Sequence, residues 1–308
     1  EPLALEALEA VLVASPAEMV EPLLGHFREA FEPVLRGGGG ASTTAEVARG
    51  AARCWAAAGG ALLRRGGFTE AADKFLKALL GALEEKDAPL TPFVPVAFQV
   101  MMPPSFDGGS ESAASTAKLP PLALQQLSRT VLPSLLSVAK SAAAAAPAGV
   151  CPAGSAGMAA LESAVTLLAA LPAEVSCSDC EEEMRWCTLT ALRYLGEESA
   201  ESRVLAAQAL QLLVRATKRG SAWVEDDLNA VVQPLVLACS SHSVPLVRLG
   251  CLQALKSLTE QSQGHMLTFK RQIEQALRKA VEDRKREVRL LAVACLNSWH
   301  CGMTADRV

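Results

Sequence analysis

The sequence predicts an all-α protein built from repeated pairs of amphipathic helices. Half of its 308 residues are hydrophobic and only 4% are aromatic. A chain rich in Ala and Leu but poor in aromatic residues favours helices over sheets. Apolar residues recur at the helical period along most of the chain. Towards the C-terminus, a two-helix pattern also repeats every 41 to 45 residues.

The repeat is clearest in three helices that share one template. The apolar stripe occupies positions i, i+3, i+4, i+7, i+8 and i+11, and it begins at Ser202, Val247 and Val288. This spacing places the stripe on one face of an α-helix. In the last helix the stripe comprises Val288, Leu291, Ala292, Cys295, Leu296 and Trp299.

Partner helices precede the last two templates, with apolar stripes from Leu228 to Cys239 and from Ile273 to Val281. A two-helix unit of about 40 to 47 residues is typical of HEAT repeats. The sequence therefore predicts a HEAT-type α-solenoid of about six or seven helical pairs.

The N-terminal part of the chain shows the same pattern less clearly. Helices are predicted within 2–15 and 16–36, and two more within 43–65 and 68–87. A run of four glycines at 37–40 marks the break between these pairs.

Composition divides the middle of the chain. Prolines concentrate between 88 and 121, which predicts a loop with room for a short helix around 96–102. Short Ala, Gly and Pro runs follow the next helix. The expected organisation is, in chain order, N-terminal HEAT-like helical pairs at 1–87, a Pro-rich loop at 88–121, a helix at 122–140, a low-complexity linker at 141–157, C-terminal HEAT repeats at 158–302 and a tail at 303–308.

The turn before the last helix combines a capping residue with a repeated cation. Asp283 stands where a carboxylate can cap the helix. An Arg follows the first stripe position in each template, as Arg203, Arg248 and Arg289. Such an Arg can lie along the boundary between repeats and meet a carboxylate of its neighbour. We expect a ladder of these contacts, with Trp299 in the core. The ladder is imperfect, because the position of Asp283 is Glu197 in one repeat and His242 in the other.

Charge is unevenly distributed, although the net charge is only −4. Between Lys270 and Arg289 there are eight basic and four acidic residues, and between Glu174 and Glu201 eight acidic and two basic ones. Solvated turns are often this charged, but complementary patches also steer partners. The overall balance gives no case for direct binding of nucleic acid. The candidates for partner contact are the solvent-facing cations Lys279, Arg284, Lys285 and Arg286.

Few motifs carry chemistry. The CxxC pair of Cys177 and Cys180 has a spacing that suits zinc or a redox dithiol. The nearby Cys187 lies within a helical pattern, and no second CxxC exists. A loop between repeats is the favoured interpretation, and a metal site is the alternative. The four histidines are scattered singly, and neither a phosphate-binding loop nor a nucleophile elbow is present. The sequence therefore indicates neither an enzyme nor a cofactor.

The expected compartment follows from two absences. The first residues lack a positively charged leader, and no window of the sequence has the length of uncharged apolar residues that a membrane span needs. We therefore expect an intracellular protein with no membrane partner, whose cysteines are reduced.

The end of the chain resembles the Mms-nineteen family. The resemblance lies in "VRLGCLQALKSLTE" at 247–260, "LTFKRQIEQALRKAVEDRKREVR" at 267–289 and the following Trp299. The family pattern is a Val-Arg helix, a Leu-x-aromatic-Lys helix and a turn of acidic, Asp and three basic residues before Val-Arg. The match covers roughly 244–302. This chain departs from the pattern at Ala280, often Pro in the family, and at Leu290-Leu291, which replace a charged pair.

The resemblance implies a non-catalytic HEAT-repeat adaptor of the cytosolic iron–sulfur cluster assembly targeting complex. Its carboxy-terminal repeats would dock a small cysteine-bearing assembly factor, which in turn binds a WD-repeat propeller. Other surfaces would engage client apo iron–sulfur proteins such as DNA helicases and polymerases, in the cytoplasm and nucleus. Two other classes stay open: a generic HEAT scaffold of transport, tubulin or phosphatase type, and a small metal-binding module at Cys177 and Cys180.

Overall fold

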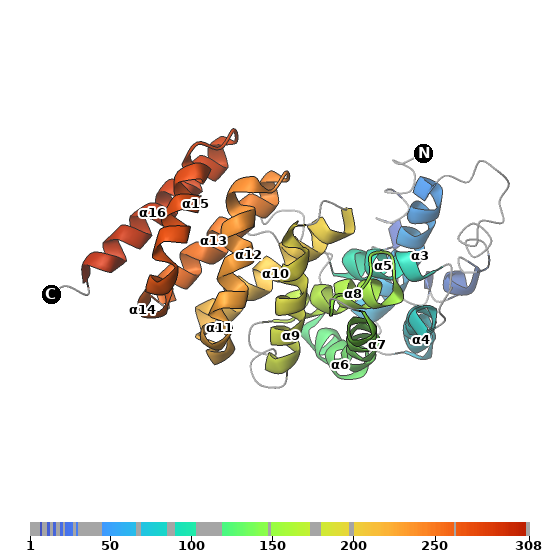
Figure 1. The fold of residues 1–308 in the computed structure, drawn as a ribbon. Coiled ribbons are helices and arrows are strands. Elements are labelled where there is room, and N and C mark those ends of the chain that lie inside the picture. The colour runs from blue at the N-terminus through green and yellow to red at the C-terminus, as the bar shows by residue number, and fades with distance from the viewer. Residues whose placement is uncertain are drawn as a thin grey trace. The chain divides into compact units, whose positions relative to one another are not determined.

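The described part of the chain is helical throughout. The computed structural model describes a few residues between 7 and 29 and the stretches 45–65, 69–84, 90–102, 119–146, 149–172, 180–196, 200–261 and 263–305. Every regular element in these stretches is a helix, so the predicted all-α class is confirmed (Figure 1). The chain divides into two compact units, Glu1–Asp179 and Cys180–Val308.

The first unit is built around a helix that is buried on nearly all sides. The unit contains α3 (Ala45–Arg65), α4 (Glu70–Glu84), the 3₁₀ helix η1 (Thr91–Phe93), α5 (Val94–Met101), α6 (Pro121–Thr130), α7 (Leu132–Ala145) and α8 (Ala156–Ala170). Every residue of α8 from Gly157 to Leu168 is buried, which is the pattern of a central helix. Helix α8 packs against α5 and α7, and α5 packs against α3. Ser155 caps α8, since its Oγ accepts a hydrogen bond from the Met158 N–H at 3.2 Å.

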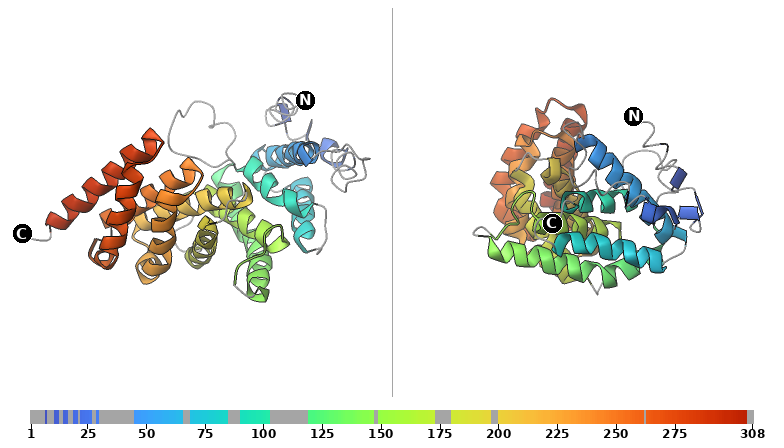
Figure 2. Two further views of the ribbon diagram at one scale, coloured as in Figure 1. Left: turned by 45° about the horizontal axis from the view of Figure 1, so that its top comes forward. Right: turned by 90° about the vertical axis from the view of Figure 1, so that its right-hand side faces the viewer.

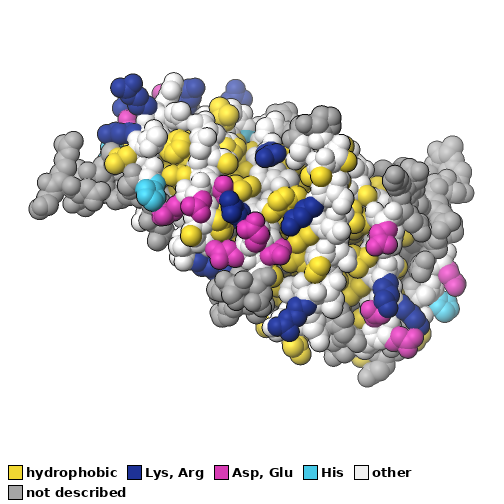
Figure 3. Space-filling model, turned by 60° about the horizontal axis from the view of Figure 1, so that its bottom comes forward, with side chains coloured by type: hydrophobic (Ala, Val, Ile, Leu, Met, Phe, Trp, Pro, Cys, Tyr) yellow, Lys and Arg dark blue, Asp and Glu magenta, His cyan; other side chains and the backbone are white. Residues whose placement is uncertain are grey.

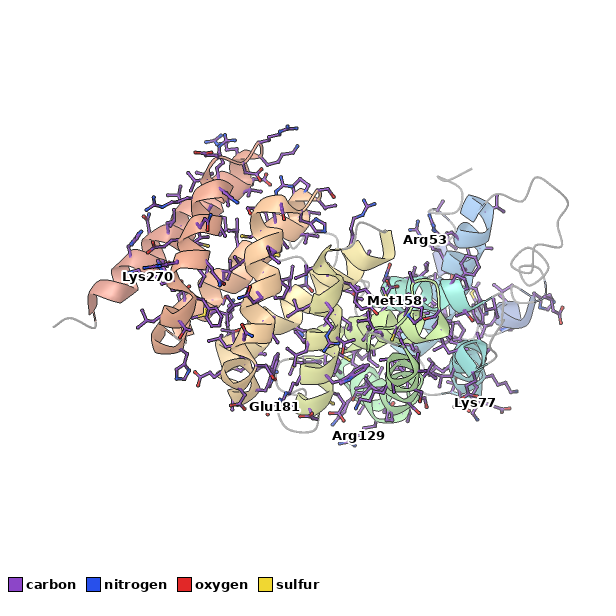
Figure 4. The ribbon with its side chains drawn as sticks, viewed as in Figure 1. Arg53, Lys77, Arg129, Met158, Glu181 and Lys270 are labelled. Atoms are coloured by element: carbon purple, nitrogen blue, oxygen red, sulfur yellow. The ribbon has the colours of Figure 1, made fainter. Side chains whose placement is uncertain are left out.

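Figure 4 labels both buried and exposed side chains of this unit. Met158 on α8 is buried, whereas Arg53 on α3 and Lys77 on α4 are exposed. Between α3 and α4, the rings of Trp55 and Phe75 pack edge to face with their centroids 4.8 Å apart, an arrangement that aromatic pairs favour. The apolar stripes of α3 and α4 therefore meet in the core.

Prolines shape two parts of the middle segment. The Pro-rich segment at 88–121 contains the buried helix α5, which overlaps the short helix expected around 96–102, and Pro95 lies in its first turn, where the missing N–H would have no helical partner. The predicted helix at 122–140 is two helices, α6 and α7, separated at Val131. Pro133 has no N–H for the carbonyl of Arg129, so the hydrogen-bond ladder is interrupted there.

The predicted low-complexity linker at 141–157 is shorter in the structure. Helix α7 continues to Ala145, because alanine is the strongest helix former. Cys151 is buried, and its thiol donates to the Ala139 carbonyl at 3.4 Å. Helix α8 begins at Ala156, and it packs with α5 and α7 in the first unit. The boundary between the two compact units lies between 179 and 180.

The second unit is a stack of helical pairs. In chain order its elements are α9 (Glu181–Leu192), η3 (Arg193–Gly196), α10 (Ala200–Arg219), α11 (Ala222–Asp226), α12 (Leu228–Ser241), α13 (Pro245–Gln261), α14 (Gln263–Met266), η4 (Leu267–Phe269), α15 (Lys270–Val281) and α16 (Arg286–Ala305). Helices α10, α13 and α16 pack in one row, and α9, α12 and α15 in the other (Figures 1 and 2). Each row also packs on the other through the pairs α9–α10, α12–α13 and α15–α16. This sequential packing is that of a helical repeat protein.

One continuous hydrophobic cluster fills the space between the two rows. The template of the last helix is buried as its period predicts, since Val288, Ala292, Cys295 and Trp299 are each at most 2% exposed. Gly250 allows a close approach of α13 to α10, because a Cβ there would lie 2.9 Å from Leu210 Cδ1. The repeat period read from the sequence therefore corresponds to the packing period of this unit.

Candidate functional site

An ion pair joins the two C-terminal repeats of the second unit. Arg248 lies in the first turn of α13, and its Nη2 donates to Asp283 Oδ1 at 2.9 Å while its Nε lies 2.7 Å from Oδ2. Both side chains are about nine-tenths buried, at 10% and 8% exposure. Two-point contact of a guanidinium with a carboxylate adds directional specificity to the charge interaction. The pair therefore sets how one repeat seats on the next.

Asp283 serves two neighbours at once. Its Oδ1 also accepts a hydrogen bond from the Lys285 N–H at 2.8 Å, which shapes the turn before α16. Burial by itself raises the pKa of Asp283. The hydrogen bonds from Arg248 and Lys285 and the positive charges of Arg248 and Arg289 outweigh burial, so its pKa lies below the ordinary 3.8. The carboxylate is therefore ionised at neutral pH.

The preceding turn has the same geometry with a different capping residue. His242 Nδ1 accepts from the Val244 N–H at 3.0 Å, as Asp283 accepts from Lys285. Arg248 Nη1 donates to the carbonyl of His242 at 2.6 Å. In the last repeat, Arg289 Nη1 donates to the carbonyl of Asp283 at 2.8 Å. Each Arg therefore ties down its own turn with one nitrogen.

Arg203 and Trp299 complete the residues that the sequence assigned to the repeat boundary. Arg203 lies in the first turns of α10 with an exposed side chain. Trp299 is 1% exposed, and its Nε1 lies 3.4 Å from Glu274 Oε1 on α15, at the long end of the hydrogen-bond range. The structure thus brings Arg248, Asp283 and Arg289 together at one boundary, while Trp299 fills the core further along α16.

The cations predicted to contact a partner gather around the turn between α15 and α16. Lys279, Arg284, Lys285 and Arg286 are all exposed. Long nitrogen-tipped side chains project from this turn in Figure 4, and Lys and Arg side chains gather at this end of the second unit in Figure 3. We call these four residues the basic turn. Within the described residues, none of their side chains forms an ion pair or hydrogen bond, so their charges face solvent.

The opposite end of the unit is acidic and more tightly paired. Helix α9 begins with Glu181, Glu182 and Glu183, where the helix dipole favours negative charge. Arg185 Nε donates to Asp227 Oδ2 at 2.7 Å, which links α9 to the start of α12. The predicted acidic segment at 174–201 lies partly outside the described residues. In its described part, Glu182 lies 3.7 Å from Arg185 on the same helix.

Of the two cysteines of the CxxC motif, the structure describes one, Cys180. Cys177 lies outside the described residues. Cys180 is 8% exposed and directly precedes α9. Within the stretches that the structure describes, no group of three or more His, Cys, Asp or Glu residues could hold a metal ion.

Three cysteines on the apolar stripes of the second unit belong to its core. Cys239, Cys251 and Cys295 lie on α12, α13 and α16 and are at most 2% exposed. Burial raises the pKa of Cys239 and of Cys295 to about 12, and it raises the pKa of Cys251 well above its ordinary value. A thiol with such a pKa is a poor nucleophile at neutral pH. These residues pack as small apolar side chains, as their place on the stripes predicts.

Sequence reasoning missed two exposed aliphatic side chains beside the basic turn. Leu290 is 60% exposed and Val293 is 42% exposed, and both lie on α16. They fall between the positions of the buried stripe, so the helical period alone places them on the solvent side. A signal was present in Leu290, which stands where the Mms-nineteen pattern has a charged residue.

The fold and this boundary define a helical repeat protein with an exposed, basic turn between α15 and α16. None of the described helices has the length and apolar character needed to cross a membrane. No protein-family model matches the chain. The chain is similar to the MMS19 nucleotide excision repair protein homolog of Arabidopsis thaliana, with 29% identity over 112 residues. The alignment covers 36% of this chain and 10% of that protein, so this chain matches about a tenth of its relative's length.

Proposed function

We propose that this chain is a non-catalytic adaptor of the Mms-nineteen family that contributes carboxy-terminal HEAT repeats to the cytosolic iron–sulfur cluster assembly targeting complex. The similarity to the MMS19 homolog is the observation that carries the proposal. The helical stack supports it, because such repeats form extended surfaces suited to binding proteins. In this proposal the iron–sulfur chemistry belongs to the partners, and this chain holds no cofactor.

The proposed adaptor links two kinds of partner. One is the assembly machinery, a small cysteine-bearing factor together with a WD-repeat propeller. The other is a set of client apo iron–sulfur proteins of DNA replication and repair, such as helicases and polymerases, in the cytoplasm and nucleus. The basic turn is the proposed contact for the assembly machinery, because its four side chains are exposed and form no hydrogen bond or ion pair among the described residues. Complementary charge on the partner would raise the association rate and the specificity.

Binding of the purified assembly factors to this chain tests the proposal. Reversing Lys285 and Arg286 to Glu removes attraction and adds repulsion, so we expect binding to weaken by a few kcal/mol if both charges lie within the interface. The affinity of the unaltered chain should also decline as salt is added. A matched control reverses Arg129 and Lys218, which are exposed cations on α6 and α10.

The control variant should bind as the unaltered chain does, since its net charge changes equally at another place. Equal binding by the Lys285 and Arg286 variant would remove the basic turn from the interface. If the unaltered chain binds neither assembly factor, the adaptor proposal fails, and the fold supports only a general protein-binding scaffold.

A further inference from the structure

The outer face of α16 corresponds to a face of α13, one repeat earlier, that is covered by another helix. The templates of α13 and α16 are offset by 41 residues, so Leu249 corresponds to Leu290 and Leu252 to Val293. In α13 this face packs against α16, where Cys295 Sγ donates to the Leu252 carbonyl at 3.2 Å. Leu252 is fully buried, whereas Val293 is 42% exposed. The described part of the chain supplies no helix to cover α16 in the same way.

In α16 the repeated Arg bonds its own turn but meets no carboxylate of a next repeat among the described residues. Arg248 uses Nη1 for its own turn and turns Nε and Nη2 towards Asp283 of the next repeat. Arg289 uses Nη1 for the carbonyls of Asp283 and Arg284, at 2.8 and 3.1 Å. Its Nε and Nη2 have no partner among the described residues. We call these two nitrogens the open edge of Arg289.

A repeat whose outer face meets only water normally presents polar side chains on that face. Here the open edge of Arg289 lies in the same two turns of α16 as the exposed Leu290 and Val293. The combination matches the boundary between α13 and α16, where a carboxylate meets the Arg and apolar side chains cover the helix. The basic turn adjoins this face, so an acidic occupant is favoured.

We propose that the outer face of α16 receives a helix of a partner protein, which places an Asp or Glu on the open edge of Arg289 and packs aliphatic side chains over Leu290 and Val293. The inference rests on the proposed function, in which the partner is the cysteine-bearing assembly factor bound to its propeller. The docked helix packs on α16 as α16 packs on α13, and its Asp or Glu contacts Arg289 as Asp283 contacts Arg248.

The first test uses the purified pair of assembly factor and propeller as the probe in titration calorimetry with the full chain. Leu290→Asp places a charge in the proposed apolar contact, and we expect about ten-fold weaker binding or more. Leu237→Asp on α12 is the matched control, because Leu237 is also helical and is 68% exposed. It should bind within about two-fold of the unaltered chain. Circular dichroism checks that both variants remain helical.

The second test addresses the charge. Arg289→Lys keeps a donor for the turn carbonyls and keeps the positive charge, but it lacks the open edge, so binding should weaken by about ten-fold. A photo-crosslinker at position 290 identifies the partner helix. Arg289→Glu should then lose binding, and a change of the crosslinked helix's nearest Asp or Glu to Arg should restore it.

The outcomes separate this inference from the proposed function. If the unaltered chain binds the pair and Leu290→Asp binds equally well, the inference is overturned and the adaptor role stands. If the unaltered chain does not bind the pair, both are overturned. If light scattering shows that Leu290→Asp dissociates a dimer of this chain while leaving binding of the pair intact, a second copy occupies the face and the inference is wrong.

Discussion

At the scale of single residues, the second unit depends on a few polar groups placed at the ends of apolar stripes. The buried pair of Arg248 and Asp283 has little tolerance for the loss of one partner, because the remaining charge would be left without compensation in a poorly hydrated site. Asp283 also holds the Lys285 N–H. Its carboxylate therefore contributes both to the packing of one repeat on the next and to the turn that precedes α16.

Acid should weaken the second unit through Asp283. Its pKa is lower in the folded protein than the ordinary 3.8, so the stability that it contributes is present above that value and is lost as pH falls through the lowered pKa. Asp283→Asn keeps an oxygen for the turn but removes the charge, and we expect a loss of roughly 1–3 kcal/mol at pH 7. Urea unfolding across pH 2 to 7 measures both proteins. Their difference should shrink below pH 3.8, and a constant difference would contradict this account.

The core tryptophan should matter through its volume. Trp299→Ala leaves a cavity among α13, α15 and α16, and we expect a loss of roughly 3–5 kcal/mol. His300→Ala is the control, because His300 is the next residue and is exposed. Denaturant unfolding compares the two variants. A Trp299→Ala protein as stable as the control would mean that the site collapses or that the ring packs elsewhere.

At the scale of elements, helices pack as closely as their smallest residues permit. Gly157 lies near the start of α8, and a Cβ there would overlap the Cβ of Ala142 on α7. Because alanine has no side-chain rotamer to move, the two helix backbones would have to separate. Gly81 on α4 differs, since no atom lies within 4 Å of its virtual Cβ.

Alanine at these two glycines should therefore have opposite effects. Gly157→Ala should destabilise the first unit by roughly 1–3 kcal/mol through overpacking. Gly81→Ala should stabilise it by roughly 0.5–1 kcal/mol, because alanine loses less backbone entropy in a helix. Thermal unfolding of the two variants gives the signs. Stabilisation by both would show that α7 and α8 can move apart at little cost.

The helical period predicted the elements better than it predicted their partners. Val288 and Trp299 could be placed in a core from spacing alone, and Arg248 could be expected to meet a carboxylate of the neighbouring repeat from its repeated position at the turns. The structure identifies that carboxylate as Asp283. Helix α8 could not be assigned to the first unit, because an apolar segment shows that it is buried but not which helices bury it. Leu290 lies off the buried stripe, so the period of α16 is consistent with its exposure. The period does not say whether such a face is covered by another helix, as the same face of α13 is covered by α16.

At the scale of the whole molecule, the second unit has a hydrophobic core of its own. The cluster that runs from Leu192 to Trp299 lies entirely within the second unit. Repeat arrays draw their stability mainly from neighbouring repeats, so the loss of the first unit should leave this cluster in place. Unit boundaries of this kind are also where a chain can be divided experimentally.

A fragment of residues 180–308 should be helical and should unfold cooperatively. The free energy of unfolding of the fragment should be only slightly lower than that of the same unit in the full chain, since its core is complete. Circular dichroism with urea unfolding measures this, and Trp299→Ala in the fragment should repeat its effect in the full chain. A fragment without a sigmoidal transition would show that the unit needs residues from the first 179.

The buried thiols of the second unit can report how often its helices open. Cys239, Cys251 and Cys295 lie on three different helices, α12, α13 and α16, and an alkylating reagent can reach each one only while its helix is open. The modification rate of each cysteine, followed by peptide mass spectrometry, therefore reports the opening free energy of α12, α13 or α16 without any introduced label. A partner that docks on α16 should slow the modification of Cys295 more than that of Cys239, which turns a core residue into a sensor of what happens on the surface.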